Sequence, residues 1–223
     1  MCIVLDKNSR MASVTPPLFL TTTYFYLFVS TVITGISRQY PLTQTLWGSL
    51  IFLIVSLVLI FIVIKMSPGP MKHVVFLGLL LSIGQMFGPL DKNITNGNAI
   101  RNTLVMVAGI FLGMTVLAFV DKGNFLGFGP YLFAGVIGLI IARLGLTFYG
   151  YEKGVTEDFK TWDKILSYVG VGIFALYTAY DTQKLKQYGE SLGPKGKPDY
   201  INASLDLYLD ILNLFVNVED ILS

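Results

Sequence analysis

Apolar stretches alternate with short polar or turn-forming segments along most of the chain. A membrane-spanning helix needs about 20 mostly apolar residues, and six of the stretches approach this length. They are Leu18–Ile36, Thr45–Ile64, Val74–Leu90, Thr103–Val120, Phe128–Phe148 and Ile165–Tyr180. The connecting segments are short, so neighbouring helices are expected to run antiparallel. The pattern therefore predicts an all-α integral membrane protein.

A seventh stretch, Tyr200–Leu222, is apolar but also contains Asp206, Asp210, Glu219 and Asp220. Carboxylates are tolerated at membrane depth only where they face protein or a water-filled cavity. The stretch is therefore expected to be either a polar span buried among the other six or a re-entrant segment. These alternatives place the C-terminus on opposite sides of the membrane.

Composition supports the membrane assignment. The chain has 223 residues, 53% hydrophobic and 13% charged, whereas a soluble domain carries about 25% charged residues. One cysteine and one histidine, with no GxSxG sequence, argue against a disulfide, a zinc cluster and a hydrolase triad. We therefore expect no enzymatic activity and no cofactor. The net charge of +2 and the lack of a basic tract predict no nucleic-acid partner.

The N-terminus lacks a basic region followed by a long apolar core and a cleavage site, so no cleaved signal peptide is expected. We expect residues 1–17 to form an extramembrane segment and residues 18–223 to form a single seven-helix transmembrane domain. A slight excess of Lys and Arg on one side, nine against six, favours an N-terminus on the inner, cytoplasmic side of the membrane.

Two aspartates are the main candidates for chemistry. Asp181 directly follows an apolar run, where an ordinary helix-end charge is an equally good interpretation. Asp210 lies near the middle of its segment, where a carboxylate costs roughly 2.5–3.5 kcal/mol to insert. It is expected to be protonated, paired or beside a wet cavity. Asp206 lies one turn earlier on the same face and is better explained as a solvated charge.

Two carboxylates in a low-dielectric site tend to share one proton, so such a pair is a pH sensor if the two residues meet. The connection between Asp181 and Tyr200 is long enough to allow this. Lys65, at the end of the second stretch, is a candidate counter-ion, although a routine membrane anchor is the commoner role. Arg143 lies inside the fifth stretch, and its partner is not readable from the sequence.

The segments "AYDTQKLK" and "SLDLYLDILNLFVNVEDIL" resemble the C-terminal signature of the Bax inhibitor-1 family, the transmembrane Bax-inhibitor-motif proteins. In that family, a YDT-type motif ends the sixth helix and an LYLDxxNLF-type motif occupies the seventh. The order of the preceding spans is similar as well. The resemblance covers most of the chain, but only these last two motifs are specific.

The resemblance implies a seven-helix bundle with two three-helix layers around a central polar seventh helix. It also implies a pH-sensitive calcium leak governed by Asp181 and Asp210, which would bind calcium transiently. A latch would join Asp181 to Lys65, although lysine offers a point charge where arginine would offer a bidentate fork. Arg143 stands where the family pattern has a small residue. Bacterial members lie in the inner membrane, and eukaryotic members lie in endoplasmic reticulum, Golgi or mitochondrial membranes.

Two functions therefore compete. The first is a transport protein, either a calcium-permeable leak channel or a calcium/proton exchanger, with the bilayer, calcium and protons as its partners. The second is an interaction module that modulates cell-death regulators or other membrane proteins, with structural aspartates. Calcium flux across a pH range distinguishes the two.

Overall fold

The structure is a computed structural model that describes residues 16–43, 45–87, 97–120, 123–192 and 197–222. These residues form seven α-helices and one short 3-10 helix. The helices are α1 (Pro16–Gln39), α2 (Leu46–Lys65), α3 (Pro70–Met86), α4 (Gly97–Val120), η2 (Phe125–Phe128), α5 (Gly129–Lys153), α6 (Glu157–Ser191) and α7 (Tyr200–Leu222). The predicted extramembrane segment 1–17 lies outside the described residues, except for its last two residues, which begin α1.

The predicted all-helical bundle is confirmed. Each of the seven predicted stretches corresponds to one α-helix. Four segments in the described residues are long and apolar enough to cross a membrane: Pro17–Gln39, Trp47–Lys65, Ile100–Val120 and Phe125–Lys153. Helix α3 is apolar but has only 17 residues. Helix α7 carries four acidic residues and is mostly buried within the bundle, whereas α6 carries its charged side chains mainly in its terminal turns and exposes apolar side chains such as Tyr168 and Val169 between them.

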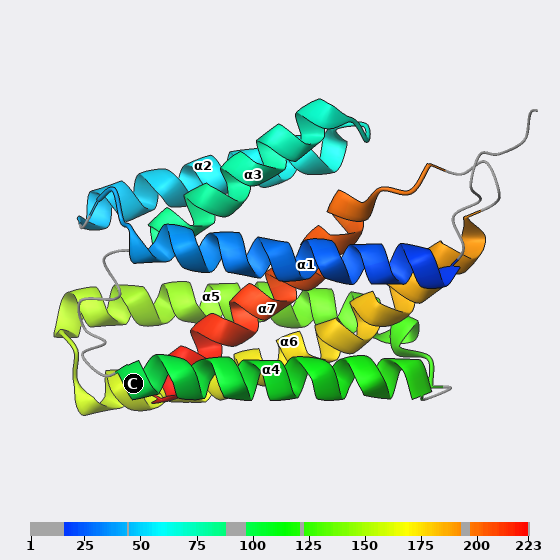
Figure 1. Ribbon diagram of the computed structural model, residues 1–223. Coiled ribbons are helices and arrows are strands. Elements are labelled where there is room, and N and C mark those ends of the chain that lie inside the picture. Colours follow the sequence, from blue (N-terminus) through cyan, green and yellow to red (C-terminus); the bar gives the residue numbers. More distant parts are fainter. Residues whose placement is uncertain (1–15, 44, 88–96, 121–122, 193–196, 223) are drawn as a thin grey trace, which may run out of the picture.

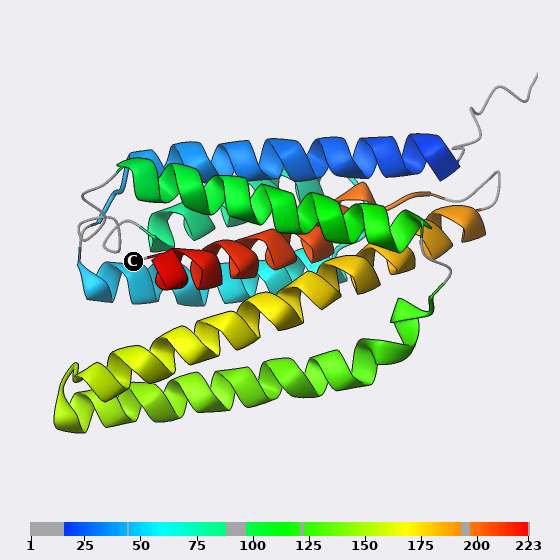
Figure 2. The same cartoon turned by 90° about the horizontal axis from the view of Figure 1, so that it is seen from below.

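The helices form two layers with α7 between them. Helices α1, α2 and α3 pack together on one side, whereas α4, α5 and α6 pack together on the other. Figure 1 shows α7 crossing the bundle obliquely between these groups, and Figure 2 shows it running beside α4 and α6 when the bundle is seen from below. Helix α7 contacts helices of both layers. This is the arrangement of two three-helix layers around a seventh helix that the family resemblance implies.

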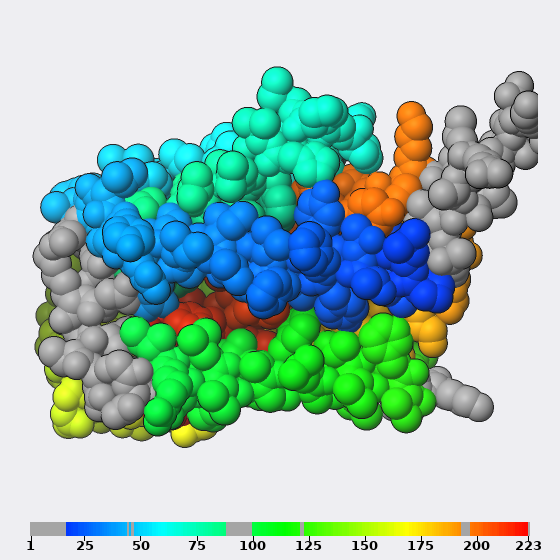
Figure 3. Space-filling view, in the orientation of Figure 1, coloured from blue at the N-terminus to red at the C-terminus, as the bar shows by residue number. Residues whose placement is uncertain are grey.

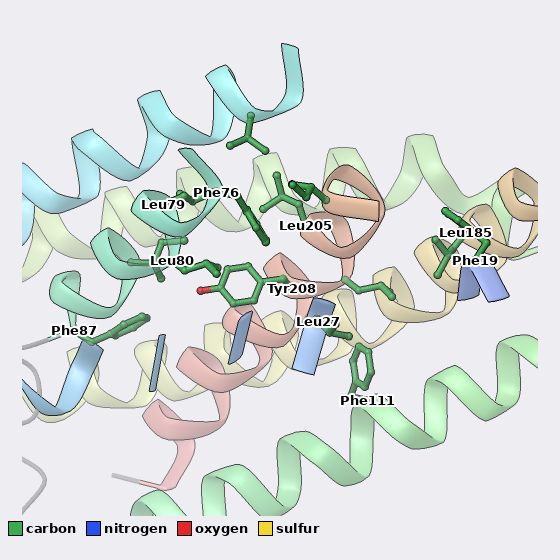
Figure 4. Packing of buried hydrophobic residues seen from close by; sticks show 14 residues of the cluster. Phe19, Leu27, Phe76, Leu79, Leu80, Phe87, Phe111, Leu185, Leu205 and Tyr208 are labelled. Atoms are coloured by element: carbon green, nitrogen blue, oxygen red, sulfur yellow. The ribbon is translucent and has the colours of Figure 1, made fainter. Parts of the chain in front are cut away.

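Helix α7 divides its apolar side chains between the two layers. Leu205 and Tyr208 are fully buried against α1 and α3, with Phe76, Leu79 and Leu80 among their neighbours (Figure 4). About two to three turns after Tyr208, Leu214 and Val218 pack against Val107, Leu139 and Phe174 of the other layer. The apolar side chains of α7 thus serve two separate cores, and Asp210 lies on α7 between the two sets.

Helix α6 is longer at both ends than the predicted stretch Ile165–Tyr180. Its first turn begins after Thr156, whose hydroxyl accepts a hydrogen bond from the Phe159 amide at 3.2 Å, and contains Glu157 and Asp158. Such caps and acidic first turns stabilise helix N-termini. With 35 residues, α6 is about 52 Å long, well above the ~30 Å of a hydrocarbon layer. The predicted stretch was based on apolar residues, so it did not include the charged turns of α6 that lie outside this layer.

Candidate functional site

Asp210 lies in the interior of the bundle. Its residue is only 4% exposed, and it follows the buried Leu207 and Tyr208 on α7. Within the described residues, its Oδ2 atom is buried and has no hydrogen-bond partner. A buried carboxylate oxygen without a partner is costly. A proton, a water molecule or a cation bound at this atom would remove that cost.

Asp181 lies inside α6, whereas the family motif implied that it ends this helix. The helix continues to Ser191, and Asp181 is 8% exposed. It lies within electrostatic range of Asp210. No hydrogen bond joins Asp181 and Asp210 in the described part of the chain. Their close approach in some state therefore stays a prediction.

The cation beside Asp181 is Lys184 and not the predicted Lys65. The Lys184 ammonium lies 3.6 Å from Asp181 Oδ1 and 2.7 Å from Asp206 Oδ2. Lys65 instead lies with its ammonium 5.9 Å from the centre of the Phe61 ring, and among the described residues it forms no ion pair. The spacing of Asp181 and Lys184, three residues apart on one helix, is a signal that the sequence contains. The predicted stretch Ile165–Tyr180 ends before this pair, so the pair lies outside it.

A cavity of about 320 Å³ opens between α6 and α7 beside this ion pair. Its lining includes Asp181, Lys184, Asp206, Asp199 and Asn202. The exposed fraction of the carboxylate side chains falls from 40% at Asp206 to 10% at Asp181. Asp210, which does not line the cavity, is more deeply buried. The three carboxylates thus form a series from the cavity toward the interior, which suits a path for protons or cations.

Lys72 is a buried charge that the sequence analysis missed. Its ammonium is fully buried and donates hydrogen bonds to Asp199 Oδ2 at 2.6 Å and to the Met66 carbonyl at 3.0 Å. Asp199 also lines the cavity. The pair therefore joins the start of α3 to the residue that precedes α7. From the sequence, Lys72 is indistinguishable from a solvated loop lysine.

Arg143 is held in a polar cluster at the far end of α7. Its guanidinium donates to Ser167 Oγ and to Asn217 Oδ1, both at 2.9 Å. It also forms ion pairs with Asp163 Oδ1 at 3.3 Å and with Asp220 Oδ2 at 3.2 Å. The cluster joins α5, α6 and α7. Asp220 is ten residues after Asp210, about 15 Å along the helix, so Arg143 is separate from the aspartate pair.

Arg143→Met is expected to lower the free energy of unfolding by about 2 kcal/mol. Removing one partner of a buried pair costs about 3–5 kcal/mol and of an exposed pair 0–1 kcal/mol, and these side chains are about one-third exposed. Equilibrium unfolding in mixed micelles measures the change. Lys164→Met, at an exposed position on α6, is the control and should stay within about 0.5 kcal/mol of wild type. Equal stability of the two variants would show that the cluster contributes nothing.

The end of α7 is also joined to the opposite layer. Arg38 of α1 forms an ion pair with Glu219 at 2.9 Å. The Arg38 guanidinium lies 5.2 Å from the ring centre of Phe87 and 5.0 Å from that of Phe215, which are cation–π distances. Glu219 and Asp220 therefore connect one end of α7 to both three-helix layers.

The described residues contain no group of three or more His, Cys, Asp or Glu side chains suited to hold a metal ion. The predicted absence of a cofactor and of enzymatic activity stays a prediction.

Comparison with known proteins identifies the family. A family model described as "Inhibitor of apoptosis-promoting Bax1" matches residues 17–223. The inner membrane protein YbhL of Escherichia coli is 35% identical over 53% of this chain and 49% of its own length. Protein lifeguard 4 of Mus musculus is 32% identical over 53% of this chain and 44% of its own length. The chain thus spans about half the length of these two relatives.

A third relative is matched over more of its length. The uncharacterised protein YrjE of Lactococcus lactis is 31% identical over 76% of this chain and 71% of its own length. The family match, the helical architecture and the apolar spans agree with one another. This chain belongs to the Bax inhibitor-1 family of multi-pass membrane proteins.

Proposed function

We propose that this chain is a pH-sensitive calcium transport protein, either a leak channel or a calcium/proton exchanger, with Asp181 and Asp210 in its ion path. The observation that carries the proposal is the buried Asp210 carboxylate, whose Oδ2 has no hydrogen-bond partner among the described residues. A purely structural residue at this position would be apolar or fully hydrogen-bonded.

The arrangement near the cavity supports the same role. Asp206 and Asp181 lie beside the cavity, and Asp210 lies deeper, within electrostatic range of both. Calcium prefers carboxylate and carbonyl oxygens. Lys184 already holds a positive charge next to Asp181 and Asp206. It therefore competes with an entering cation for the same carboxylates.

Protonation acts on this arrangement in two opposing ways. A proton on Asp181 neutralises one of the two carboxylates that hold Lys184, so the ammonium is held less firmly. The same proton removes negative charge that attracts calcium. Flux therefore depends on pH through these groups, and the measurement decides which effect dominates.

Calcium flux in liposomes tests the proposal. The purified protein is reconstituted with a calcium indicator inside, and flux is measured between pH 5 and pH 8. We expect flux above that of protein-free liposomes, with a clear pH dependence. Flux equal to that of empty liposomes at every pH would contradict the proposal.

A second measurement separates the two transport modes. Liposomes with equal calcium on both sides receive an imposed pH gradient. An exchanger uses the pH gradient to accumulate calcium on one side of the membrane. A leak channel does not accumulate calcium when the membrane potential is clamped.

An interaction role is the second candidate, because the family description names inhibition of an apoptosis-promoting protein. Absence of flux in both liposome experiments would favour it.

A further inference from the structure

A cavity of about 280 Å³ lies between α1, α4 and α7, away from the carboxylates described above. We refer to it as the α1–α4 groove. Its lining includes Thr34, Gly35 and Arg38 of α1, Ile100 and Leu104 of α4, and Tyr208, Ile211, Leu212 and Phe215 of α7. Figure 3 shows the surface of α7 between α1 and α4, so the groove opens sideways on this face of the bundle.

The groove exists because α1 and α4 hardly touch each other. Each packs against α6 and α7, but in the described residues α1 and α4 make at most marginal contact. Gly35 widens the gap, since a Cβ atom placed there would meet no atom within 4 Å.

Hydrocarbon surrounds this opening. Helices α1 and α4 both contain spans long and apolar enough to cross a membrane, so their gap faces lipid chains. Inside the groove, the hydroxyls of Thr34 and Tyr208 bond to each other at 2.5 Å and need no water. Most of the other lining side chains are apolar. The volume is slightly below the ~300–1,000 Å³ of small-molecule pockets, which suits a single hydrocarbon chain.

Two arginines lie at one end of the groove. Arg38, near the end of α1, lines it, and its charge is balanced by Glu219. Arg101 is exposed on α4, directly after the lining residue Ile100. Thr31 also lines the groove, seven residues before Arg38, so the groove extends about 10 Å along α1. The charged end thus lies toward the membrane surface, where a basic residue attracts anionic headgroups.

We propose that the α1–α4 groove binds one acyl chain of an anionic membrane phospholipid whose headgroup lies beside Arg101. The proposal is independent of calcium transport, because none of the groove residues is one of the three path carboxylates. The lipid chain packs against Ile211 and Leu212, which directly follow Asp210 on α7 and are only partly buried by the protein.

Lipid titration followed by native mass spectrometry tests the proposal. Delipidated protein in detergent is titrated with phosphatidylglycerol or phosphatidylcholine of identical chains. We expect one tightly bound phospholipid, with about fivefold preference for phosphatidylglycerol, because one basic residue contributes about 1 kcal/mol of attraction to anionic lipid. Arg101→Gln should keep binding but lose the preference. A wild-type protein without a saturable lipid would overturn the proposal.

Gly35→Phe fills the groove and should weaken lipid binding at least tenfold. Gly113→Phe is the matched control. Gly113 is also exposed, with no atom within 4 Å of an added Cβ, but it lies on the side of α4 opposite Leu104. If Gly35→Phe does not fold, Leu104→Trp fills the groove from its other wall. Unchanged lipid binding in a folded groove variant would overturn the proposal. A wild-type protein that forms a dimer, and that the groove variant converts to a monomer, would overturn it as well.

Discussion

Asp210→Asn is expected to lower calcium flux at pH 7 by at least about tenfold. The substitution keeps the size of the side chain but replaces a group that can ionise, and so attract a cation, with a neutral amide. At an effective dielectric of 20, a unit charge pair at 4 Å is worth about 4 kcal/mol, and 1.4 kcal/mol corresponds to a tenfold change. Much of the attraction offsets dehydration of the ion, so tenfold is a lower bound. Calcium influx into liposomes at equal protein content measures the effect.

Stability is expected to distinguish this loss from misfolding. A carboxylate at membrane depth costs roughly 2.5–3.5 kcal/mol to insert, so the asparagine variant should unfold no more easily than wild type. Asp158→Asn is the control, because Asp158 is exposed in the first turn of α6 and should leave flux unchanged. Wild-type flux in a folded Asp210→Asn protein would remove Asp210 from the ion path.

Lys184→Met is expected to change both the size and the pH dependence of the flux. Without the ammonium, Asp181 and Asp206 no longer have the partner seen at 3.6 and 2.7 Å. Calcium then meets less positive charge at the cavity, and flux at pH 8 should rise about fivefold. An opposite charge favours an ionised carboxylate, so its loss should shift the midpoint of the pH profile upward. Since Lys184 is about half exposed, roughly half a pH unit is expected.

Three variants make this result specific to Lys184. Lys184→Arg keeps the charge and should restore the wild-type midpoint. Lys186→Met removes a nearby charge on the same helix and should have no effect. Lys65→Met tests the latch that the family resemblance implies. A shifted midpoint in the Lys65 variant, with none in the Lys184 variant, would show that the latch and not the observed pair controls gating.

The sequence was sufficient to predict the helices and their order. Apolar runs of membrane-spanning length are a strong signal, because every backbone polar group must be satisfied within lipid. The resemblance to a known family then implied the layers around α7, which the structure confirms. Helix ends were predicted less well. The extensions of α6 lie at charged turns such as Glu157 and Asp158, where apolarity carries no information.

Only the acidic residues of the candidate site could be predicted from the sequence. Asp210 is conspicuous because it interrupts an apolar run, whereas Lys184 and Lys72 occur in segments that read as ordinary polar loops. Which cation faces which acid depends on how far α6 continues and how α7 is rotated. The partners of Arg143 could not be predicted either, because Asn217 and Asp220 are more than seventy residues away in the sequence.

Charged pairs hold α7 at both ends, with consequences for how the bundle can move. Before its first turn, Asp199 is bound to Lys72 of α3. At its last turns, Glu219 is bound to α1 and Asp220 to α5. If one layer rocked against the other, α7 would have to break its pair with one of them. Motion confined to the α6–α7 cavity, such as a rotamer change of Lys184, breaks none of these pairs. The ion pairs therefore fix the position of α7 in the bundle, whereas the Lys184 side chain beside it is able to move.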